Sequence, residues 1–291
     1  MSGPAEFAPE SCRGEGRFPG AGGCRLFFRW ARPAQPRGVL VVVHGLGEHS
    51  GRYQAMARAL VAGQFAYYGH DLRGHGQSDG PRGDVRRFGE YTEDLDAFLR
   101  EVRGREERLP IFLMGHSLGG VIAVLYALDH PSGLAGLVAA STPFELASPP
   151  TKFSLIAARL LSVLTPRLTV GNDLDPGELS SDPEVVAAYL TDPLVQRRVT
   201  IQWAREFFGN YPLAIERASK LSLPLLVLHS EGDKIASVAG ARAFLQRAGS
   251  ADKTLHAYPD LRHELLNELP ERRRQVFADL LAWLAAHVKA Q

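Results

Sequence analysis

The 291-residue sequence predicts an α/β fold, with a mostly parallel central sheet and helices on both of its faces. One observation is the continuous β-branched and apolar run Val39–Val43, which suits a strand buried on both faces of its sheet. A second is the helical period between such runs, as in Glu90–Val102, where the apolar residues fall on one face of a helix. Strands that alternate with helices are joined by crossovers and therefore run parallel.

The remaining core elements follow from the same two patterns. Further strands are expected at Arg25–Trp30, Phe65–Tyr68, Ile111–Met114, Leu137–Ala140, Leu225–Leu228 and Thr254–Ala257. Further helices are expected at Gly119–Asp129, Val238–Arg247 and Glu271–Lys289. Together they predict a core of residues 21–144 and 216–291. The glycine, proline and charge of residues 1–20 predict a flexible leader before it.

Residues 145–215 interrupt the alternation because they contain no convincing strand. Helices are expected at Phe153–Leu164, Glu184–Leu190 and Val195–Phe208, so the segment predicts a helical cap inserted into the core. In the first of these helices, apolar residues recur at helical spacing: Phe153, Ile156, Ala157, Leu160, Leu161 and Leu164. The stripe has two interpretations, a lid that lines an acyl tunnel and contacts lipid, or a helix packed on the core.

Composition and hydropathy give no support for nucleic-acid binding, for export or for a membrane span. The 33 basic and 32 acidic side chains leave a formal net charge of +1, which gives no electrostatic argument for nucleic acid. The N-terminus lacks the apolar segment of an export signal, and no apolar run reaches the roughly 18 residues that suggest a membrane span. We therefore expect a cytoplasmic protein in which Cys12 and Cys24 are free thiols rather than a disulfide.

The strongest local signal is Gly115-His116-Ser117-Leu118-Gly119, which follows a predicted strand and opens a predicted helix. This context is typical of a nucleophile elbow, a sharp turn that pushes a serine oxygen out over the edge of the sheet. Side chains at the two glycine positions would collide with neighbouring backbone. A serine hydroxyl also needs a base to remove its proton, so Ser117 is a candidate nucleophile only if a histidine and a carboxylate accompany it.

In this fold the acid and then the histidine follow the serine along the chain. Asp233 lies just past the carboxyl end of the strand Leu225–Leu228, and His263 comes after the next strand. Glu231, Asp252 and Asp260 are competing carboxylates, and they are interpreted as solvated loop charges. Another histidine downstream of Asp233, His256, sits inside a predicted strand.

Acyl transfer also needs N–H donors for the oxyanion of its tetrahedral intermediate. The backbone N–H of Leu118, directly after the serine, is one candidate, and that of Leu46, in the loop after Val39–Val43, is the other. A metal site is the competing interpretation of the histidines in this region, which are His44, His49, His70 and His75. No cysteine or paired carboxylate joins them at ligand spacing, so no metal is expected.

Longer motifs resemble those of monoacylglycerol lipases and the related lysophospholipases, within the S33 serine aminopeptidase group. They are the runs 44–53 (HGLGEHSGRY), 74–80 (GHGQSDG), 115–120 (GHSLGG), 189–194 (YLTDPL) and 261–270 (LRHELLNELP). The resemblance covers about residues 25–290. It implies an α/β-hydrolase core with a helical cap, no cofactor, and hydrolysis of a monoacylglycerol to a fatty acid and glycerol.

The resemblance also assigns roles to residues. It implies Ser117, Asp233 and His263 as the catalytic triad and the N–H groups of Leu46 and Leu118 as the oxyanion hole. A polar pocket for the glycerol hydroxyls would be lined by Glu48, Arg52, His116 and Tyr189. For Glu48 and Arg52 a structural ion pair that braces the loop is the alternative.

The sequence departs from the family pattern at Leu46, where a small residue is common, and at His229-Ser230, where a glycine commonly follows the strand. Other functions remain open: a lysophospholipase, a general carboxylesterase, an aminopeptidase, or a non-catalytic ligand receptor on the same scaffold. The expected partner is a lipid-like small molecule, with peripheral membrane contact through the cap as a hypothesis. Nothing in the sequence gives the oligomeric state.

Overall fold

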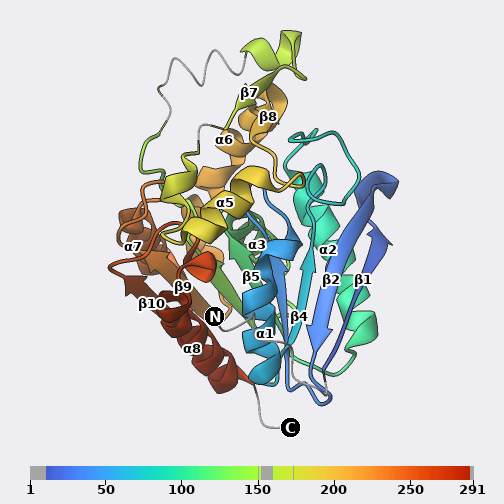
Figure 1. Cartoon of the computed structure of the whole chain (residues 1–291), viewed down its shortest axis with the longest axis vertical. Helices are drawn as coiled ribbons and strands as arrows, with labels where there is room; N and C mark the ends of the chain where they lie inside the picture. Colours follow the sequence, from blue (N-terminus) through green and yellow to red (C-terminus); the bar gives the residue numbers. More distant parts are fainter. Residues whose placement is uncertain (1–10, 150, 152–159, 173, 289–291) are drawn as a thin grey trace.

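The computed structural model describes residues 11–149, 151, 160–172 and 174–288, and it is built around an eight-stranded sheet (Figure 1). The strand order is β1-β2-β4-β3-β5-β6-β9-β10. The bounds are β1 Cys12–Pro19, β2 Arg25–Arg32, β3 Val39–Val43, β4 Ala66–His70, β5 Ile111–His116, β6 Gly136–Ala140, β9 Leu225–Ser230 and β10 Lys253–Tyr258. β1 pairs antiparallel with β2, and β2 with β4, whereas the pairs from β4 to β10 are parallel. The α/β fold is therefore confirmed.

Helices cover both faces of this sheet because its strands are apolar on both sides. In β3, Val39, Val41 and Val43 join one core cluster, and Leu40 and Val42 join the other. The first cluster packs against α2, α3, α6 and α7, and the second against α1 and α8. The helix bounds are α1 Gln54–Ala62, α2 Gly89–Arg105, α3 Leu118–Asp129, α6 Ile201–Glu216, α7 Val238–Arg247 and α8 Pro270–His287.

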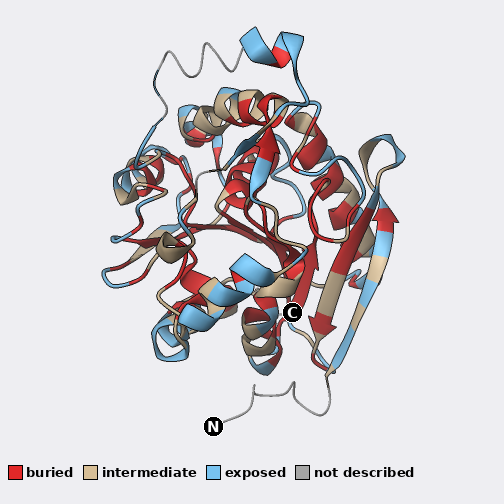
Figure 2. Cartoon of the chain, turned by 45° about the horizontal axis from the view of Figure 1, so that its top comes forward, coloured by how far each residue is buried: buried red, intermediate tan, exposed pale blue. Residues whose placement is uncertain are grey.

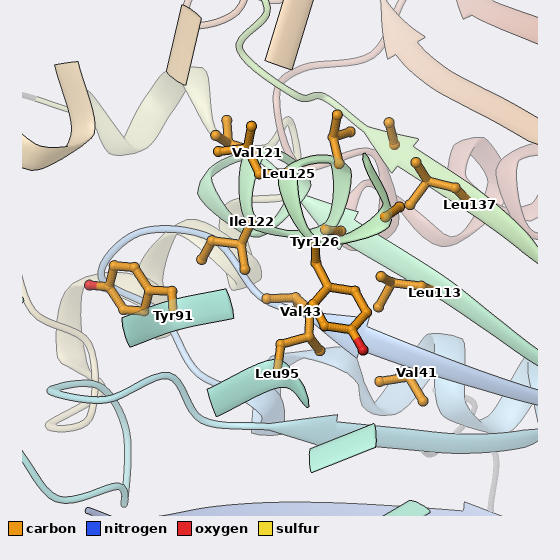
Figure 3. Packing of buried hydrophobic residues seen from close by; sticks show 14 of the residues in the cluster. Val41, Val43, Tyr91, Leu95, Leu113, Val121, Ile122, Leu125, Tyr126 and Leu137 are labelled. Atoms are coloured by element: carbon orange, nitrogen blue, oxygen red, sulfur yellow. The ribbon is translucent and has the colours of Figure 1, made fainter. Parts of the chain in front are cut away.

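The packing around α3 shows why this helix is apolar on nearly every side. In Figure 3, Ile122 and Tyr126 of α3 point toward the strands and α2, while Val121 and Leu125 lie on the opposite side of the helix. Tyr91 and Leu95 of α2 close the same cluster. The central strands and α3 therefore form a closely packed base, coloured as buried in Figure 2, and this base holds the turn between β5 and α3.

The flexible leader predicted for residues 1–20 is wrong in its second half, because Cys12–Pro19 forms β1; residues 1–10 lie outside the described residues. The glycines that suggested flexibility are packing positions. A Cβ at Gly14 would lie 2.8 Å from the Trp30 ring, and one at Gly16 would lie 2.6 Å from the Phe28 ring. The aromatic rings of β2 cover the bare backbone of β1, so glycine here permits a close approach rather than disorder.

The cap also differs from the sequence prediction, because it contains two short strands. β7 (Thr169–Gly171) and β8 (Arg198–Thr200) pair antiparallel, where no strand was expected. Each is too short to produce a visible alternation of apolar and polar residues. The helix predicted at Val195–Phe208 therefore begins later, as α6, while α5 (Pro183–Thr191) lies near its predicted position.

The apolar stripe of the cap is only partly described. Phe153, Ile156 and Ala157 lie outside the described residues, whereas residues 160–164 are helical and stand at the top of the cap in Figure 1. Leu160 is 65% exposed and Leu164 is 78% exposed. The second interpretation of the stripe required these side chains to pack on the core, and these two do not.

Two further expectations concern the thiols and the membrane. Cys12 and Cys24 are both free, at opposite ends of the β1–β2 pair. Within the described parts of the chain, no helix combines the length and the apolar character needed to span a bilayer.

Candidate active site

Ser117 lies on the turn between β5 and α3, in a backbone conformation that side chains rarely adopt. Its φ is 52° and its ψ is −120°. A Cβ at Gly115 would lie 2.1 Å from the carbonyl oxygen of Gly119, and one at Gly119 would lie 2.1 Å from the carbonyl oxygen of Val43. Both flanking glycines are therefore required by contact with backbone, and the packed strands and helix hold a turn that is strained by about 1–3 kcal/mol.

A chain of hydrogen bonds links Ser117 to two residues from distant loops. His263 Nε2 lies 3.0 Å from Ser117 Oγ, and His263 Nδ1 lies 2.7 Å from Asp233 Oδ2. The other carboxylate oxygen of Asp233 accepts the N–H groups of Ile235 at 2.8 Å and Ala236 at 3.0 Å. The structure thus brings together the three residues predicted as nucleophile, base and acid.

The electrostatics of this chain suit proton transfer. Burial alone would lower the pKa of His263, but the carboxylate of Asp233 outweighs it and raises the pKa above its ordinary value. Burial likewise opposes ionisation of Asp233, yet the contact with His263 holds the pKa of Asp233 below its usual range. Asp233 therefore stays ionised and keeps a proton on Nδ1, which leaves Nε2 free to accept the proton of Ser117.

Ser230, which departs from the glycine of the family pattern, connects the loops of Asp233 and His263. Its side chain is fully buried, donates a hydrogen bond to the Leu261 carbonyl, and accepts one from Gly232 N–H at 3.1 Å. The neighbouring His229 lies 3.0 Å, through Nε2, from the carbonyl of Ala236, the residue whose N–H supports Asp233. This departure therefore adds a tie between the two loops and leaves the geometry of Asp233 intact.

The two predicted oxyanion donors both lie at the cavity in front of Ser117, whose lining includes Leu46 and Leu118. As the first residue of α3, Leu118 has an N–H group without an intrahelical acceptor. The loop that carries Leu46 is held by Glu48, whose Oε1 accepts Gly45 N–H at 2.7 Å. Their role as an oxyanion hole stays a prediction.

The histidines that might have suggested a metal have structural surroundings. His44 accepts Leu72 N–H at 2.9 Å, and its other ring nitrogen lies 2.8 Å from the Gly45 carbonyl. Burial lowers the pKa of both His70 and His75 to about 4, so these rings are neutral. Among the residues that the structure describes, no group of three or more histidine, cysteine or carboxylate side chains is arranged to hold a metal ion.

Glu48 and Arg52 belong to a buried ion cluster whose third member, Glu264, the sequence analysis did not single out. Arg52 contacts Glu264 through both terminal nitrogens, at 2.6 and 2.8 Å, and Glu48 Oε2 at 3.2 Å. Tyr53 OH donates to Glu48 Oε1 at 2.7 Å. Burial raises the pKa of Glu48, whereas Arg52 outweighs burial and holds the pKa of Glu264 below its usual range. We call Glu48, Arg52 and Glu264 the Arg52 cluster.

His116 and Tyr189 line the cavity with polar atoms that have no hydrogen-bond partner among the residues the structure describes. The Nδ1 of His116 is buried without a hydrogen bond in the described structure, and the neighbouring Tyr189 hydroxyl and Asn172 Nδ2 form no well-aligned bond. Tyr189 comes from α5 of the cap, and its ring stacks 5.1 Å from the Arg52 guanidinium. Buried polar atoms without a partner are costly, so this end of the cavity is suited to a ligand that bears hydroxyl groups.

The cavity as a whole has a volume of about 490 Å³ and lies between core and cap. Its polar end is formed by Glu48, His116, Asn172, Tyr189 and Glu264. The rest of its wall is mostly apolar: Leu146, Val170, Leu174, Leu179, Val199, Trp203, Phe207, Phe208 and Ile235. Ser117 lies in the lining together with both regions, as an ester bond between a polar alcohol and an apolar acyl chain requires.

Comparison with known proteins agrees with this geometry. Residues 34–270 match the family model described as serine aminopeptidase, S33. The monoacylglycerol lipase of Mycolicibacterium smegmatis is 36% identical over 280 residues, which are 96% of this chain and 99% of that protein. The monoglyceride lipase of Homo sapiens is 37% identical over 273 residues, covering 91% and 88% of the two chains.

A solved structure of a monoacylglycerol lipase is similar over the same length of chain. The crystal structure of the Paleococcus ferrophilus monoacylglycerol lipase superposes with a TM-score of 0.80 at 32% identity, over 96% of this chain and 99% of that one. The matches extend over the core and the cap rather than over the motif around Ser117 alone. The chain therefore belongs to the serine aminopeptidase S33 family of α/β-hydrolases and is a carboxylic ester hydrolase.

Proposed function

We propose that the chain hydrolyses the ester bond of monoacylglycerols through an acyl-enzyme on Ser117, with release of a fatty acid and glycerol. The observation that carries the proposal is the hydrogen-bonded chain Ser117–His263–Asp233 at a cavity whose lining combines a group of polar residues with a mostly apolar remainder. The lipases similar over nearly the whole chain support the same substrate class.

The mechanism follows from the positions of these groups. His263 Nε2 removes the proton of Ser117 as its oxygen attacks the ester carbonyl, and the N–H groups of Leu46 and Leu118 stabilise the oxyanion. The tetrahedral intermediate collapses when His263 gives its proton to the leaving glycerol oxygen. His263 then removes a proton from water, which attacks the acyl-enzyme, and the fatty acid leaves while Ser117 regains its proton.

The polar end supports glycerol as the leaving alcohol. Unpartnered atoms of His116, Tyr189 and Asn172 face a cavity in which a hydroxyl group would complete their hydrogen bonds. A site built to bond hydroxyls rejects alcohols that lack them, because its buried polar groups are then left unpaired. Glu48 and Arg52 act in this proposal through their mutual contact, which shapes the polar wall.

The nearest alternative is a lysophospholipase or a general carboxylesterase. The test is a panel of purified substrates with the same acyl chain: the monoacylglycerol, the lysophosphatidylcholine and the ethyl ester, with di- and triacylglycerol as controls. The proposal expects the highest kcat/KM for the monoacylglycerol. Equal or higher kcat/KM for the ethyl ester would contradict a glycerol-binding site, and aminoacyl arylamide turnover would instead indicate an aminopeptidase.

A second proposal concerns the exposed apolar residues of the cap, which we propose contact a lipid surface peripherally. Leu160, Val163 and Leu164 are 65%, 74% and 78% exposed, and Leu168 follows at 51%. Co-sedimentation with neutral phosphatidylcholine vesicles tests this, with Leu160→Ser/Leu164→Ser as the variant. Reduced vesicle binding with unchanged turnover of a water-soluble short-chain ester is expected; unchanged vesicle binding would remove the proposal.

A further inference from the structure

We propose that Glu264 makes this site selective against phosphate-bearing headgroups, because it cancels the positive charge of Arg52. The inference rests on the proposed function, since it concerns the alcohol part of the same ester. It separates neutral monoacylglycerols from lysophospholipids, which carry a phosphate on the glycerol unit.

The contacts of Arg52 bind both terminal nitrogens of its guanidinium to carboxylates of the protein. Both terminal nitrogens face the two oxygens of Glu264, at 2.6 and 2.8 Å, and Nη1 also contacts Glu48 at 3.2 Å. The side chains of Arg52 and Glu264 are 9% and 5% exposed. A bidentate pair of this kind is the geometry in which an arginine otherwise binds a phosphate.

The carboxylates, and not the guanidinium, form the surface that a substrate meets. Glu48 and Glu264 both line the cavity, while Arg52 lies behind them and is not part of its lining. Asn267 Nδ2 donates to Glu264 Oε2 at 3.0 Å, which fixes the carboxylate in this position. One guanidinium faces two carboxyl groups. The net charge of the Arg52 cluster is therefore zero if Glu48 is protonated and negative if Glu48 is ionised.

The remaining titratable groups of the described cavity wall do not supply a cation either. Lys234 is in the lining, but its side chain is 72% exposed and pairs with Glu178 at 2.9 Å, so its charge is balanced by a carboxylate and screened by solvent. Burial lowers the pKa of His116 to about 3, which keeps the ring neutral. His263 contacts Asp233 and must be neutral to accept the proton of Ser117.

A neutral glycerol and a glycerol phosphate therefore meet very different surroundings. The hydroxyls find buried donors and acceptors on His116, Tyr189 and Asn172. A phosphate would lose its hydration next to two carboxylates, and no unpaired cation of the described lining would compensate this loss. Discrimination of this kind comes from repulsion of the wrong ligand as well as attraction of the right one.

The experiment compares kcat/KM for a monoacylglycerol, a lysophosphatidylcholine and a lysophosphatidic acid with the same acyl chain. The wild-type enzyme is expected to prefer the monoacylglycerol over the lysophosphatidic acid by at least 100-fold. Glu264→Gln keeps the hydrogen-bonding shape but removes the charge, and it is expected to lower this preference at least tenfold. The lysophosphatidic acid should gain more than the lysophosphatidylcholine, since it carries the larger negative charge.

Glu268→Gln is the matched control. Glu268 is fully buried near Glu264 and accepts Arg262 N–H at 2.8 Å, but it does not line the cavity. Its replacement should leave the ratio between the substrates unchanged, even if the variant is less stable. Thermal unfolding verifies the fold of both variants, and Glu264→Met, with an apolar group of similar length, is a second way to remove the charge.

Two results would overturn the inference. One is a wild-type enzyme that hydrolyses the lysophosphatidic acid as efficiently as the monoacylglycerol, which decides the question without any variant. The other is a folded Glu264→Gln or Glu264→Met enzyme whose substrate ratio stays within twofold of the wild type. Failure of the proposed function would look different, because the wild-type enzyme would then not favour the monoacylglycerol over the ethyl ester either.

Discussion

The base under Ser117 and the part of the cap around α5 are held by different kinds of contact, although both border the same cavity. Ser117 sits on a base of fully buried strands and α3, where even a single added Cβ at Gly119 would strike the backbone. Within the cap, α6 packs on this base through apolar side chains, whereas the segment that follows α5 meets the core loops through polar contacts. Asp192 Oδ2 lies 2.9 Å from His49 Nε2, and Gln196 N–H donates to the Gly47 carbonyl at 2.8 Å.

This difference indicates that the two regions have different functions. Close packing fixes the reacting atoms, because a packed interior permits one arrangement and resists displacement. Polar contacts between loops and cap are individually weaker, and they place residues to which we assign a role in substrate selection, such as Tyr189 on α5. Changes in the base should therefore reduce kcat, and changes in the cap contacts should mainly alter KM or the substrate ratio.

The largest effect is expected from Ser117→Ala. Loss of the nucleophile should reduce kcat/KM by about 10⁴-fold or more, since acyl transfer depends on this oxygen. The thermal unfolding midpoint should stay close to that of the wild type, because alanine adds no atom to the strained turn. A variant that retains full activity in a monoacylglycerol assay would contradict the assignment of the nucleophile.

A smaller but still large effect is expected from Asp233→Asn. We expect kcat to fall by roughly 10³–10⁴-fold, because the amide no longer holds the correct tautomer of His263. The acidic limb of the pH profile is a second readout. Wild-type kcat/KM should fall as the pH drops through a pKa of His263 that Asp233 holds above its ordinary value.

The sign of the change follows from the same interaction. Neutral His263 is the active form, so activity is lost below its pKa, and a raised pKa moves this loss to higher pH. Asp233→Asn removes the charge that raises the pKa, and its acidic limb should therefore move to lower pH. A limb that keeps its position would show that Asp233 does not set the pKa of the base.

Gly119→Ala tests the packed base directly. The new Cβ would lie 2.1 Å from the Val43 carbonyl oxygen, so we expect a loss of about 1–3 kcal/mol in the free energy of unfolding and a lower kcat. Gly104→Ala is the matched control, since a Cβ there meets nothing within 4 Å in α2. It should stabilise the protein by about 0.5–1 kcal/mol, as measured by denaturant unfolding.

The smallest effect is expected at the contact between His49 and Asp192. Asp192→Asn weakens a pair that is partly exposed, so we expect KM for the monoacylglycerol to rise about three- to tenfold with kcat nearly unchanged. Asp182→Asn is the control at the other end of α5, where the side chain caps the helix by accepting Glu184 N–H at 2.9 Å. A fall in kcat for Asp192→Asn would contradict the view that this contact of the cap affects substrate binding and not the chemical step.

The sequence predicts the base better than the cap for a physical reason. The elbow of Ser117 and the strand before Asp233 are local patterns, and the order of parallel strands brings their carboxyl ends to one edge. Glu264 could be placed only with the fold in hand, because its partner Arg52 is distant in sequence. Asn172 follows β7, a strand of three residues that leaves no periodic signal.

For β1, the sequence led to a prediction of too little structure. Gly14 and Gly16 are typical of flexible segments, yet here they allow the rings of Trp30 and Phe28 to lie against the backbone. A local pattern contains no information about which side chains the neighbouring strand contributes. Composition therefore predicts disorder reliably only where no partner strand is available.

Reaction with a fluorophosphonate, followed by intact mass measurement and peptide mapping, tests the account most directly. We expect a single adduct on Ser117 in the wild type and strongly reduced labelling in His263→Ala, because the hydroxyl needs its base. An enzyme that hydrolyses monoacylglycerol without forming this adduct, or that carries the adduct on another residue, would contradict the account.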